Sequence, residues 1–439
     1  MVKSLNKLYF HRLSFVQFED YRKYAERTFH FSRGGRSITK GCKYVLHLLV
    51  VLGISALVSP LTALAARTIQ VGIILPLTGH LADFGEMEKQ SFALALEEIN
   101  GGGGVKGKKL VFLYENDTGK PEVGRLVARK LISEDKVVML GGGYSSSVTY
   151  AVAEVAQQHR LPFLINSGPA DNFTEQGWDY VFRLSPPASE YVSGLESFLA
   201  EVVKPKTAAI IQEDSIYGRE SAQFFKKSCK NLGIDVLMVK AYRQGTDNFK
   251  PILSKVKEVD PDIVYLSSHI RDGALLMKQA RQIRILPKLF IGGTVGFTLP
   301  EFAQYAGRAS EKLITPTPWH QAIPLPSAQN YFTRFKARYN KNPDYHGAAA
   351  YAAAYVIKDA LQRARSFAPH YIKQSLKETR LMTLLGPVRF TSYDGKTNQN
   401  KTSTYIVQWQ LSRLKLIWPR RFADADYVYP VDWLSEWGY

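Results

Sequence analysis

The residues with the clearest capacity for chemistry are the three glycines, one tyrosine and three serines of 141–147. They follow an apolar run at 137–140 and precede apolar residues at helical spacing, so a strand, a glycine turn and a helix N-terminus are expected. Glycines let a ligand approach the backbone, and the first turn of a helix leaves N–H groups unpaired at the positive end of its dipole. This stretch is predicted to bind an anion, most simply a carboxylate, with the hydroxyls of Ser145 and Ser146 beside it. An alternative is that Ser145 only caps the helix and the glycines only form the turn.

A hydrolase is the nearest enzymatic alternative. Residues 143–147 match the G-x-S-x-G pattern of a nucleophile elbow, except that a serine replaces the last glycine. A catalytic triad would also need a histidine, and His269, His320 and His346 follow in the chain without a recognisable partner motif. We therefore expect a protein that is not an enzyme; the hydrolase alternative predicts turnover that depends on Ser145.

No cofactor or metal site is expected. Residues 102–109 match most of a phosphate-binding loop, but Lys109 stands where Ser or Thr is required, and the motif follows a helix instead of a strand. The sequence has no H-E-x-x-H motif, and its two cysteines, Cys42 and Cys229, are too few for a zinc site of the cysteine type.

Strands and helices alternate in two successive sets. Strands are predicted at 69–75, 109–115, 137–140 and 161–165 in the first set and at 207–212, 234–241, 262–268 and 288–292 in the second. Three helical stretches at 328–339, 345–365 and 369–379 and a strand at 404–410 follow. Such alternation forms parallel sheets covered by helices, so an α/β fold with two Rossmann-like lobes is expected. Prolines at 186–187 and 315–318 are interpreted as crossings between the lobes.

A cleft between the two lobes is the expected ligand site. In open parallel sheets, ligands bind beyond the carboxyl ends of the strands. The loops expected to face the cleft are 79–84, 141–146, 166–171, 213–217, 267–271 and 292–296.

The net charge of +18 raises nucleic acid as a partner, but its distribution does not favour one. Residues 1–66 hold ten Lys and Arg against three Asp and Glu. The rest of the chain has no run of five like charges and no stripe of basic residues interleaved with aromatic ones. No nucleic-acid partner is expected.

The N-terminal region is typical of a signal peptide. Residues 44–66 carry no charged side chain, and their apolar core at 45–58 has the length of a signal-peptide core. Ala63-Leu64-Ala65 fits a cleavage site, so we expect a leader at 1–65 that is cleaved after Ala65 and a periplasmic location. The alternative is an uncleaved N-terminal anchor, because the whole uncharged run could span a membrane.

Several motifs resemble those of a known family. They are Val71–Gly79, Gly85, Glu98–Gly107, Lys130–Ile132, Ser145–Ser147, Tyr180–Arg183, Tyr217-Gly218, Thr246–Phe249 and Gly386–Phe390, in order along nearly all of 67–410. On these residues the chain resembles the leucine/isoleucine/valine-binding (branched-chain amino acid-binding) family of periplasmic solute-binding proteins of ABC transporters. The resemblance implies a type I periplasmic binding fold, with two lobes joined by a multi-strand hinge. It places 66–185 and 318–387 in the first lobe and 186–317 and 388–439 in the second.

The resemblance also implies a carboxylate site. Ser145, with the backbone of Tyr144 and Ser146, looks like the position at which the family binds the α-carboxylate of an amino acid. The loop at Gly168 looks like the segment whose backbone joins that site. This agrees with the anion site expected from the helix N-terminus.

Three further positions look like the walls of the family's cleft. Phe84 and Tyr217 match aromatic residues on opposite lobes, and His269 lies where another aromatic residue is usual. The alternatives are packing between the lobes for Phe84 and Tyr217 and a solvated loop position for His269.

Two positions depart from the pattern of amino-acid binders. The carboxylate that holds the ligand's ammonium aligns with Thr294, whose hydroxyl offers no charge to offset desolvation of an ammonium. A hydroxyl residue expected near Gly168 aligns with Ala170, beside Asp171. A carboxylate without an amine, or an amide, therefore fits these residues at least as well as an amino acid.

The expected function is that of an exported, monomeric solute-binding protein that closes on a small carboxylate-bearing solute, either an amino acid or a related organic acid or amide, and presents it to the membrane permease of an ABC transporter. The rival is a cytoplasmic sensor of the same fold that binds an amide and regulates a partner protein. Cleavage of the leader distinguishes the exported solute-binding protein from the cytoplasmic sensor. The sequence leaves open the solute, the permease and whether 1–43 are translated.

Overall fold

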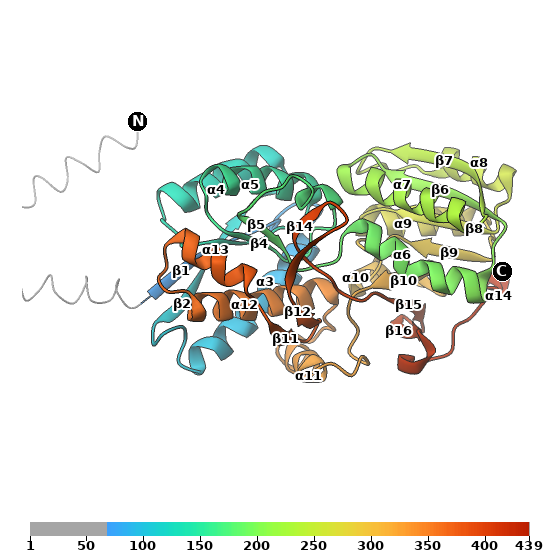
Figure 1. Ribbon diagram of the computed structural model, residues 1–439. Helices are drawn as coiled ribbons and strands as arrows, with labels where there is room; N and C mark the ends of the chain where they lie inside the picture. The colour runs from blue at the N-terminus through green and yellow to red at the C-terminus, as the bar shows by residue number, and fades with distance from the viewer. Residues whose placement is uncertain (1–67, 439) are drawn as a thin grey trace, which may run out of the picture. The chain divides into compact units, whose positions relative to one another are not determined.

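The computed structural model describes residues 68–438. The predicted leader at 1–65, its apolar core at 45–58 and the cleavage site after Ala65 lie outside these residues. The described strands form two seven-stranded sheets and one two-stranded sheet, the latter made of β11 (Leu381–Thr383) and β12 (Gly386–Val388). Each large sheet is covered by helices and forms one lobe (Figure 1).

The sheet of the first lobe has the strand order β13–β14–β5–β4–β3–β1–β2. Strand β1 (Thr68–Leu75) is almost wholly buried, as expected of a parallel strand with helices on both faces. It pairs in parallel with β2 (Lys109–Asn116) along its whole length. The remaining strands are β3 (Leu140–Gly142), β4 (Phe163–Ile165), β5 (Val181–Arg183), β13 (Phe390–Tyr393) and β14 (Lys396–Asn400).

The helices of the first lobe come from two separate parts of the chain. They are α3 (Ala82–Gly101), α4 (Pro121–Ser133), α5 (Ser146–Gln158), α11 (Ala328–Tyr339), α12 (Tyr345–Arg363) and α13 (Pro369–Lys377). A 3-10 turn at Asp171–Phe173 follows β4. The alanine-rich α12 is buried along most of its length and packs on α3 (Figure 1). Small side chains allow this close approach.

The sheet of the second lobe has the order β16–β15–β10–β9–β8–β6–β7. Strands β6 to β10 pair in parallel, whereas β15 and β16 are antiparallel to their neighbours. The strands are β6 (Thr207–Glu213), β7 (Asp235–Tyr242), β8 (Ile263–Ser267), β9 (Leu289–Gly292), β10 (Ile314–Thr317), β15 (Tyr405–Gln410) and β16 (Arg413–Trp418).

The helices of the second lobe follow the same alternation. They are α6 (Ala188–Phe198), α7 (Ile216–Asn231), α8 (Lys250–Val259), α9 (Ile270–Gln282), α10 (Pro300–Ala306) and α14 (Trp433–Trp437). A π-helical turn at Leu199–Val203 extends α6, and 3-10 turns lie at Gly307–Ser310 and Arg420–Phe422. The expected α/β fold with two Rossmann-like lobes is confirmed.

The chain passes between the two sheets three times, after β5, β10 and β14. The expected lobe ranges differ from this arrangement at one place, because 388–439 was assigned to the second lobe, whereas β13 and β14 belong to the first sheet. The reason is a buried polar contact. Arg183 Nε donates to Gln399 Oε1 at 2.6 Å, and Asn400 Nδ2 donates to the carbonyl oxygen of Leu184 at 3.0 Å. The third crossing therefore follows Asn400.

One local expectation was wrong in its bounds. Residues 137–140 were expected to be a strand, but β3 starts at Leu140 and includes two glycines, because its pairing with β1 and β4 determines its register. The crossing expected at the prolines of 315–318 is found directly after β10, in which Pro316 faces Ile406 on the antiparallel neighbour.

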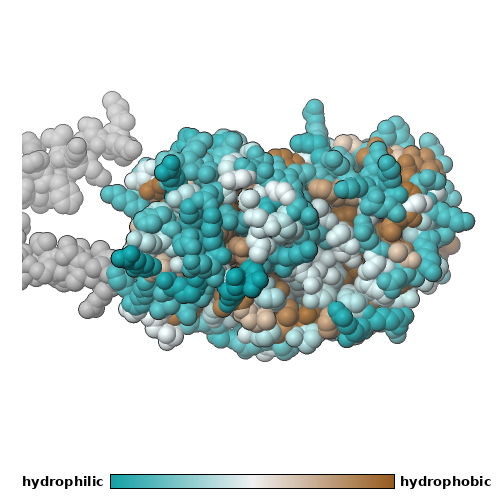
Figure 2. Space-filling model, in the orientation of Figure 1, coloured by the Kyte–Doolittle hydropathy of each residue, from teal (hydrophilic) through white to brown (hydrophobic). Residues whose placement is uncertain are grey.

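Hydrophilic residues cover most of the face shown in Figure 2, and hydrophobic ones form small groups, including some over the second lobe. Exposed apolar side chains of the second lobe include Leu237 and Val239 of β7. Within 68–438, no helix has both the length and the apolar character that a membrane crossing requires.

Candidate functional site

The glycine turn before α5 requires its glycines. Gly142 has a φ of 104°, and a Cβ at this position would lie 2.3 Å from the carbonyl oxygen of Ile74. Ser145 stands at the N-cap of α5 in extended conformation, and its side chain makes no capping hydrogen bond. The alternative in which Ser145 only caps the helix therefore lacks its hydrogen bond in the structure.

A cavity of about 290 Å³ lies between the two lobes at the N-terminus of α5. The first lobe lines it with Leu81, Gly119, Pro121, Ser145, Ser146 and Ser147. The second lobe lines it with residues that include Glu213, Asp214, Tyr217, Arg219, Gln244 and His269. The hydroxyl of Ser146 is buried without a hydrogen-bond partner among the described residues. The unpaired N–H groups of the first turn of α5 thus lie at the wall of a cavity, where they can bind an anion.

The opposite wall is acidic. Glu213, the last residue of β6, is buried, and burial raises its pKa to about 7. Its Oε1 atom lies 3.7 Å from Nε2 of His269, whose pKa is lowered to about 4 by burial. His269 is therefore neutral at pH 7. Asp214 is exposed and pairs with Arg219 at 2.6 Å.

Direct hydrogen bonds join the two lobes around this cavity. The hydroxyl of Tyr144 lies 2.9 Å from Nδ1 of His269. The Tyr305 hydroxyl donates to Asp83 Oδ2 at 2.9 Å, and the backbone N–H of Asp171 donates to Glu220 Oε2 at 2.8 Å. The lobes therefore lie in a closed arrangement, in which residues of both contact one another across the cleft.

An aromatic cluster lies beside the cavity. The ring of Phe84 stacks on that of Tyr144, with centroids 4.4 Å apart and an angle of 19°. The imidazole of His346 packs edge-on against Phe84 at 4.9 Å and lies 5.4 Å from Tyr144. The ring of His269, from the second lobe, lies 6.3 Å from that of Phe84 and 5.8 Å from that of Tyr144, so both residues pack at the lobe interface.

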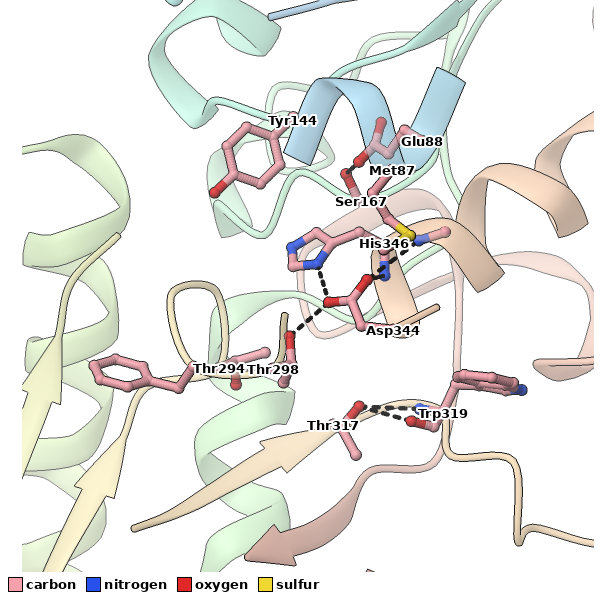
Figure 3. A network of polar contacts seen from close by, with 12 residues as sticks. Met87, Glu88, Tyr144, Ser167, Thr294, Thr298, Thr317, Trp319, Asp344 and His346 are labelled. Carbon is pink, nitrogen blue, oxygen red and sulfur yellow. Dashed lines mark hydrogen bonds and ion pairs between the residues drawn. The ribbon is translucent and has the colours of Figure 1, made fainter. Parts of the chain in front are cut away.

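A buried polar network adjoins these rings (Figure 3). Asp344, the N-cap of α12, accepts hydrogen bonds from the backbone N–H of His346 and from the hydroxyl of Thr298, which comes from the second lobe. Ser167 donates to the fully buried Glu88, whose other carboxylate oxygen has no partner among the described residues. Burial raises the pKa of Glu88 to about 7. Sequence reasoning missed this network, because its members come from four distant segments.

Four of the eight predicted site residues line the cavity: Ser145, Ser146, Tyr217 and His269. The other four, Phe84, Tyr144, Gly168 and Thr294, are buried in packing or backbone contacts and do not line it. The N–H of Gly168 donates to the carbonyl oxygen of Gly143 at 2.9 Å, and the N–H of Thr294 donates to the Thr315 hydroxyl at 3.1 Å.

Glu213 is a buried charged residue of the cavity that sequence reasoning did not single out, as it did not single out the exposed Asp214 and Arg219. It lies at the start of the loop 213–217, which was expected to face the cleft, so the topological rule provided a signal. A larger cavity of about 330 Å³ is lined by Trp319, Phe332 and Lys336 among others, but it includes none of the predicted site residues.

The geometry gives no support to the hydrolase alternative. The ring nitrogens of His269 face Tyr144 and Glu213. His320 bonds to the backbone of Leu414 and Ala322, and His346 bonds to Asp344. In the part of the chain that the structure describes, none of these imidazoles is hydrogen-bonded to Ser145, and no cluster of side chains is suited to a metal ion.

Comparisons with known proteins agree with this fold. The family model described as periplasmic binding protein matches residues 68–413. The Leu/Ile/Val-binding protein homolog 8 of Brucella melitensis is 28% identical over 384 residues, which cover 84% of this chain and 95% of the relative.

Two solved structures show the same fold. The branched-chain amino acid transporter substrate binding protein LivJ from Streptococcus pneumoniae, in complex with isoleucine, has a TM-score of 0.74 and 22% identity and covers 83% of this chain and 100% of its own. The second is a solute binding protein of an ABC transporter from Rhodopseudomonas palustris BisB5, in complex with 3,4-dihydroxy benzoic acid. It has a TM-score of 0.72 and 21% identity, and the match covers 83% of this chain and 99% of that protein.

Proposed function

Because the chain belongs to the periplasmic binding protein family, we propose that it is the extracytoplasmic solute-binding component of an ABC uptake transporter and binds a small carboxylate-bearing solute. One observation carries this proposal. The N-terminus of α5, with Ser145 and Ser146, forms one wall of a cavity whose other wall belongs to the second lobe. A solute held there contacts both lobes and favours the closed arrangement over an open one.

The ligands of the two similar structures support a carboxylate. Isoleucine and 3,4-dihydroxy benzoic acid differ in size and in the presence of an amine, but both carry a carboxylate. An anion at a helix N-terminus gains about 0.3–1 kcal/mol from the dipole alone and more where water is excluded. With further polar contacts from the second lobe, we expect micromolar affinity, which corresponds to a binding free energy of about 8 kcal/mol.

Export and transport complete the proposal. The leader at 1–65 directs the chain to the periplasm and is removed after Ala65. The protein then acts as a monomer and delivers its solute to the permease. Mass spectrometry of the protein recovered from the periplasm is expected to show an N-terminus at Ala66. Recovery from the cytosol with Met1 would instead favour the ligand sensor.

A thermal-shift screen tests solute binding. Residues 66–439 are incubated with organic acids, amides and amino acids, because a solute that binds only the folded protein raises the midpoint of unfolding. Calorimetry then compares the wild type with Ser145→Ala and Ser133→Ala, the second of which changes an exposed serine at the end of α4. Weakened binding by Ser145→Ala alone is expected. Equal affinity in all three proteins would falsify the proposed site.

A further inference from the structure

The larger cavity, of about 330 Å³, lies at the second crossing between the lobes and has no part in the proposed function. Its walls include Trp319, from the segment that follows β10 (Figure 3), Phe332 of α11 and Trp409 of β15. Helix α11 belongs to the first lobe and β15 to the second, so both lobes line this cavity. It shares no lining residue with the cavity at α5. The two cavities are therefore separate.

The walls of this cavity suit a flat, apolar molecule. The side chains of Trp319 and Trp409 are buried, and Phe332 and Leu414 add apolar surface. Aromatic side chains bind other rings by stacked and edge-on contacts. A volume of about 330 Å³ lies at the lower end of the range for small-molecule sites. These properties favour a ligand with a single aromatic ring.

Three basic side chains also line the cavity. Lys336 on α11 and Arg413 on β16 are exposed, and Lys415 on β16 is half-buried. None of the three forms an ion pair with another of the described residues. A guanidinium and two ammonium groups without acidic partners can donate charge-assisted hydrogen bonds to an anion.

The other ionisable groups at the cavity do not cancel this charge. Asp344 is the one acidic residue among the described residues that line it, and it already accepts hydrogen bonds from the Thr298 hydroxyl and the backbone N–H of His346. Burial lowers the pKa of His320, and its ring nitrogens are bonded to backbone groups, so it is neutral at pH 7. Three cations against one carboxylate leave an excess of positive charge.

We propose that this cavity is a second binding site, which takes a small aromatic anion with its ring against Trp319 and Phe332 and its charged group toward Arg413 and Lys415. The apolar walls remove the ring from water, and the basic side chains attract the anion and repel cations. Because the ligand contacts both lobes, its binding favours the closed arrangement. This site goes beyond the proposed function, which does not require it.

Phenyl phosphate is a suitable probe, because it joins one aromatic ring to a phosphate group and carries no carboxylate. Heteronuclear magnetic resonance on residues 66–439 follows the indole N–H signals, and Trp319→Phe assigns the signal of Trp319. Phenyl phosphate should shift this signal in a saturable way. Benzyl alcohol lacks the charge and inorganic phosphate lacks the ring, so each should bind at least about tenfold more weakly.

Arg413→Gln combined with Lys415→Gln tests the basic side chains. Neither residue forms an ion pair with another of the described residues, so the double variant should fold, as circular dichroism can confirm. It should bind phenyl phosphate about tenfold more weakly than the wild type. The control combines Lys227→Gln with Lys240→Gln, which removes the same charge from exposed positions on α7 and β7 and should leave the affinity unchanged.

The outcomes separate this site from the proposed function. A Trp319 signal that does not move, or equal affinity in the two double variants, would overturn the second site. Loss of the Trp319 shift in Ser145→Ala would also contradict it, because the anion would then act from the cavity at α5. Distances between spin labels on the two lobes should shift toward the closed form when phenyl phosphate is added, and unchanged distances would contradict the coupling to closure. If phenyl phosphate binds here while the screen of acids, amides and amino acids finds no solute, the proposed function fails and this site stands.

Discussion

The hydroxyl of Tyr144 lies 2.9 Å from Nδ1 of His269, so the residue that precedes the N-cap of α5 is hydrogen-bonded to the opposite lobe. Both side chains are buried, and they come from positions 125 residues apart. Closure of the lobes therefore forms a hydrogen bond that an open form lacks.

Removing this hydrogen bond should favour the open form. Tyr144→Phe keeps the stacking on Phe84 but leaves Nδ1 of His269 buried without its partner, at a cost of about 1–2 kcal/mol. The ratio of closed to open molecules should fall about five- to thirtyfold. Distances between spin labels on the two lobes measure this ratio. Tyr150→Phe, on α5 against Trp178, is the control and should leave the distances unchanged; an identical effect of both variants would contradict the role of Tyr144.

Glu88 should make stability depend on pH. Burial raises its pKa from 4.5 to about 7, although His346 and the hydrogen bond from Ser167 oppose the rise. The raised pKa means that its contribution to stability is full below about 4.5 and is lost as the pH rises through about 7. The free energy of unfolding of the wild type should therefore fall by about 3 kcal/mol relative to that of Glu88→Gln between pH 4 and pH 8. Urea unfolding measures this difference. Glu86→Gln, on the exposed face of α3, should show no such trend.

Asp344 should be the most sensitive position of the buried network. Burial alone would raise its pKa, but His346 and the hydrogen bonds that it accepts hold the pKa below its ordinary value, so its contribution persists at neutral pH and is lost only in acid. Asp344→Ala removes the cap of α12 and the contact with Thr298 together. We expect a loss of about 3–5 kcal/mol in the free energy of unfolding. Thr298→Val removes only the hydrogen bond between the lobes and should lower the free energy of unfolding by about 1 kcal/mol. Equal losses in the two variants would show that the cap of α12 contributes nothing.

Gly142 should not tolerate a side chain. Gly142→Ala combines a positive φ with a Cβ that would meet the carbonyl oxygen of Ile74, so the turn before α5 must shift. We expect the free energy of unfolding, measured by thermal unfolding, to fall by several kcal/mol, and solute binding to weaken. Gly101→Ala, at the end of α3, meets no atom within 4 Å and should leave stability equal or slightly higher. A Gly142→Ala variant as stable as the wild type would contradict the turn geometry.

The sequence alone determined the local elements and their alternation. The apolar run at 69–75 and the proline at the start of α4 each indicated the element that the structure contains, because burial and helix initiation depend on residues close in the chain. The same local logic predicted an anion site at the N-terminus of α5. It placed the β6 end, and hence Glu213, in a loop facing the cleft without assigning it a function.

Tertiary structure decided which of these residues share the cavity. Glu213 lies opposite Ser145, Tyr144 contacts His269, and Thr298 reaches Asp344, in each case from one lobe to the other. The pairing of β14 with β5 likewise depends on Arg183 and Gln399, which are 216 residues apart. No local pattern records such contacts, because their free energy arises only when closure removes both partners from water.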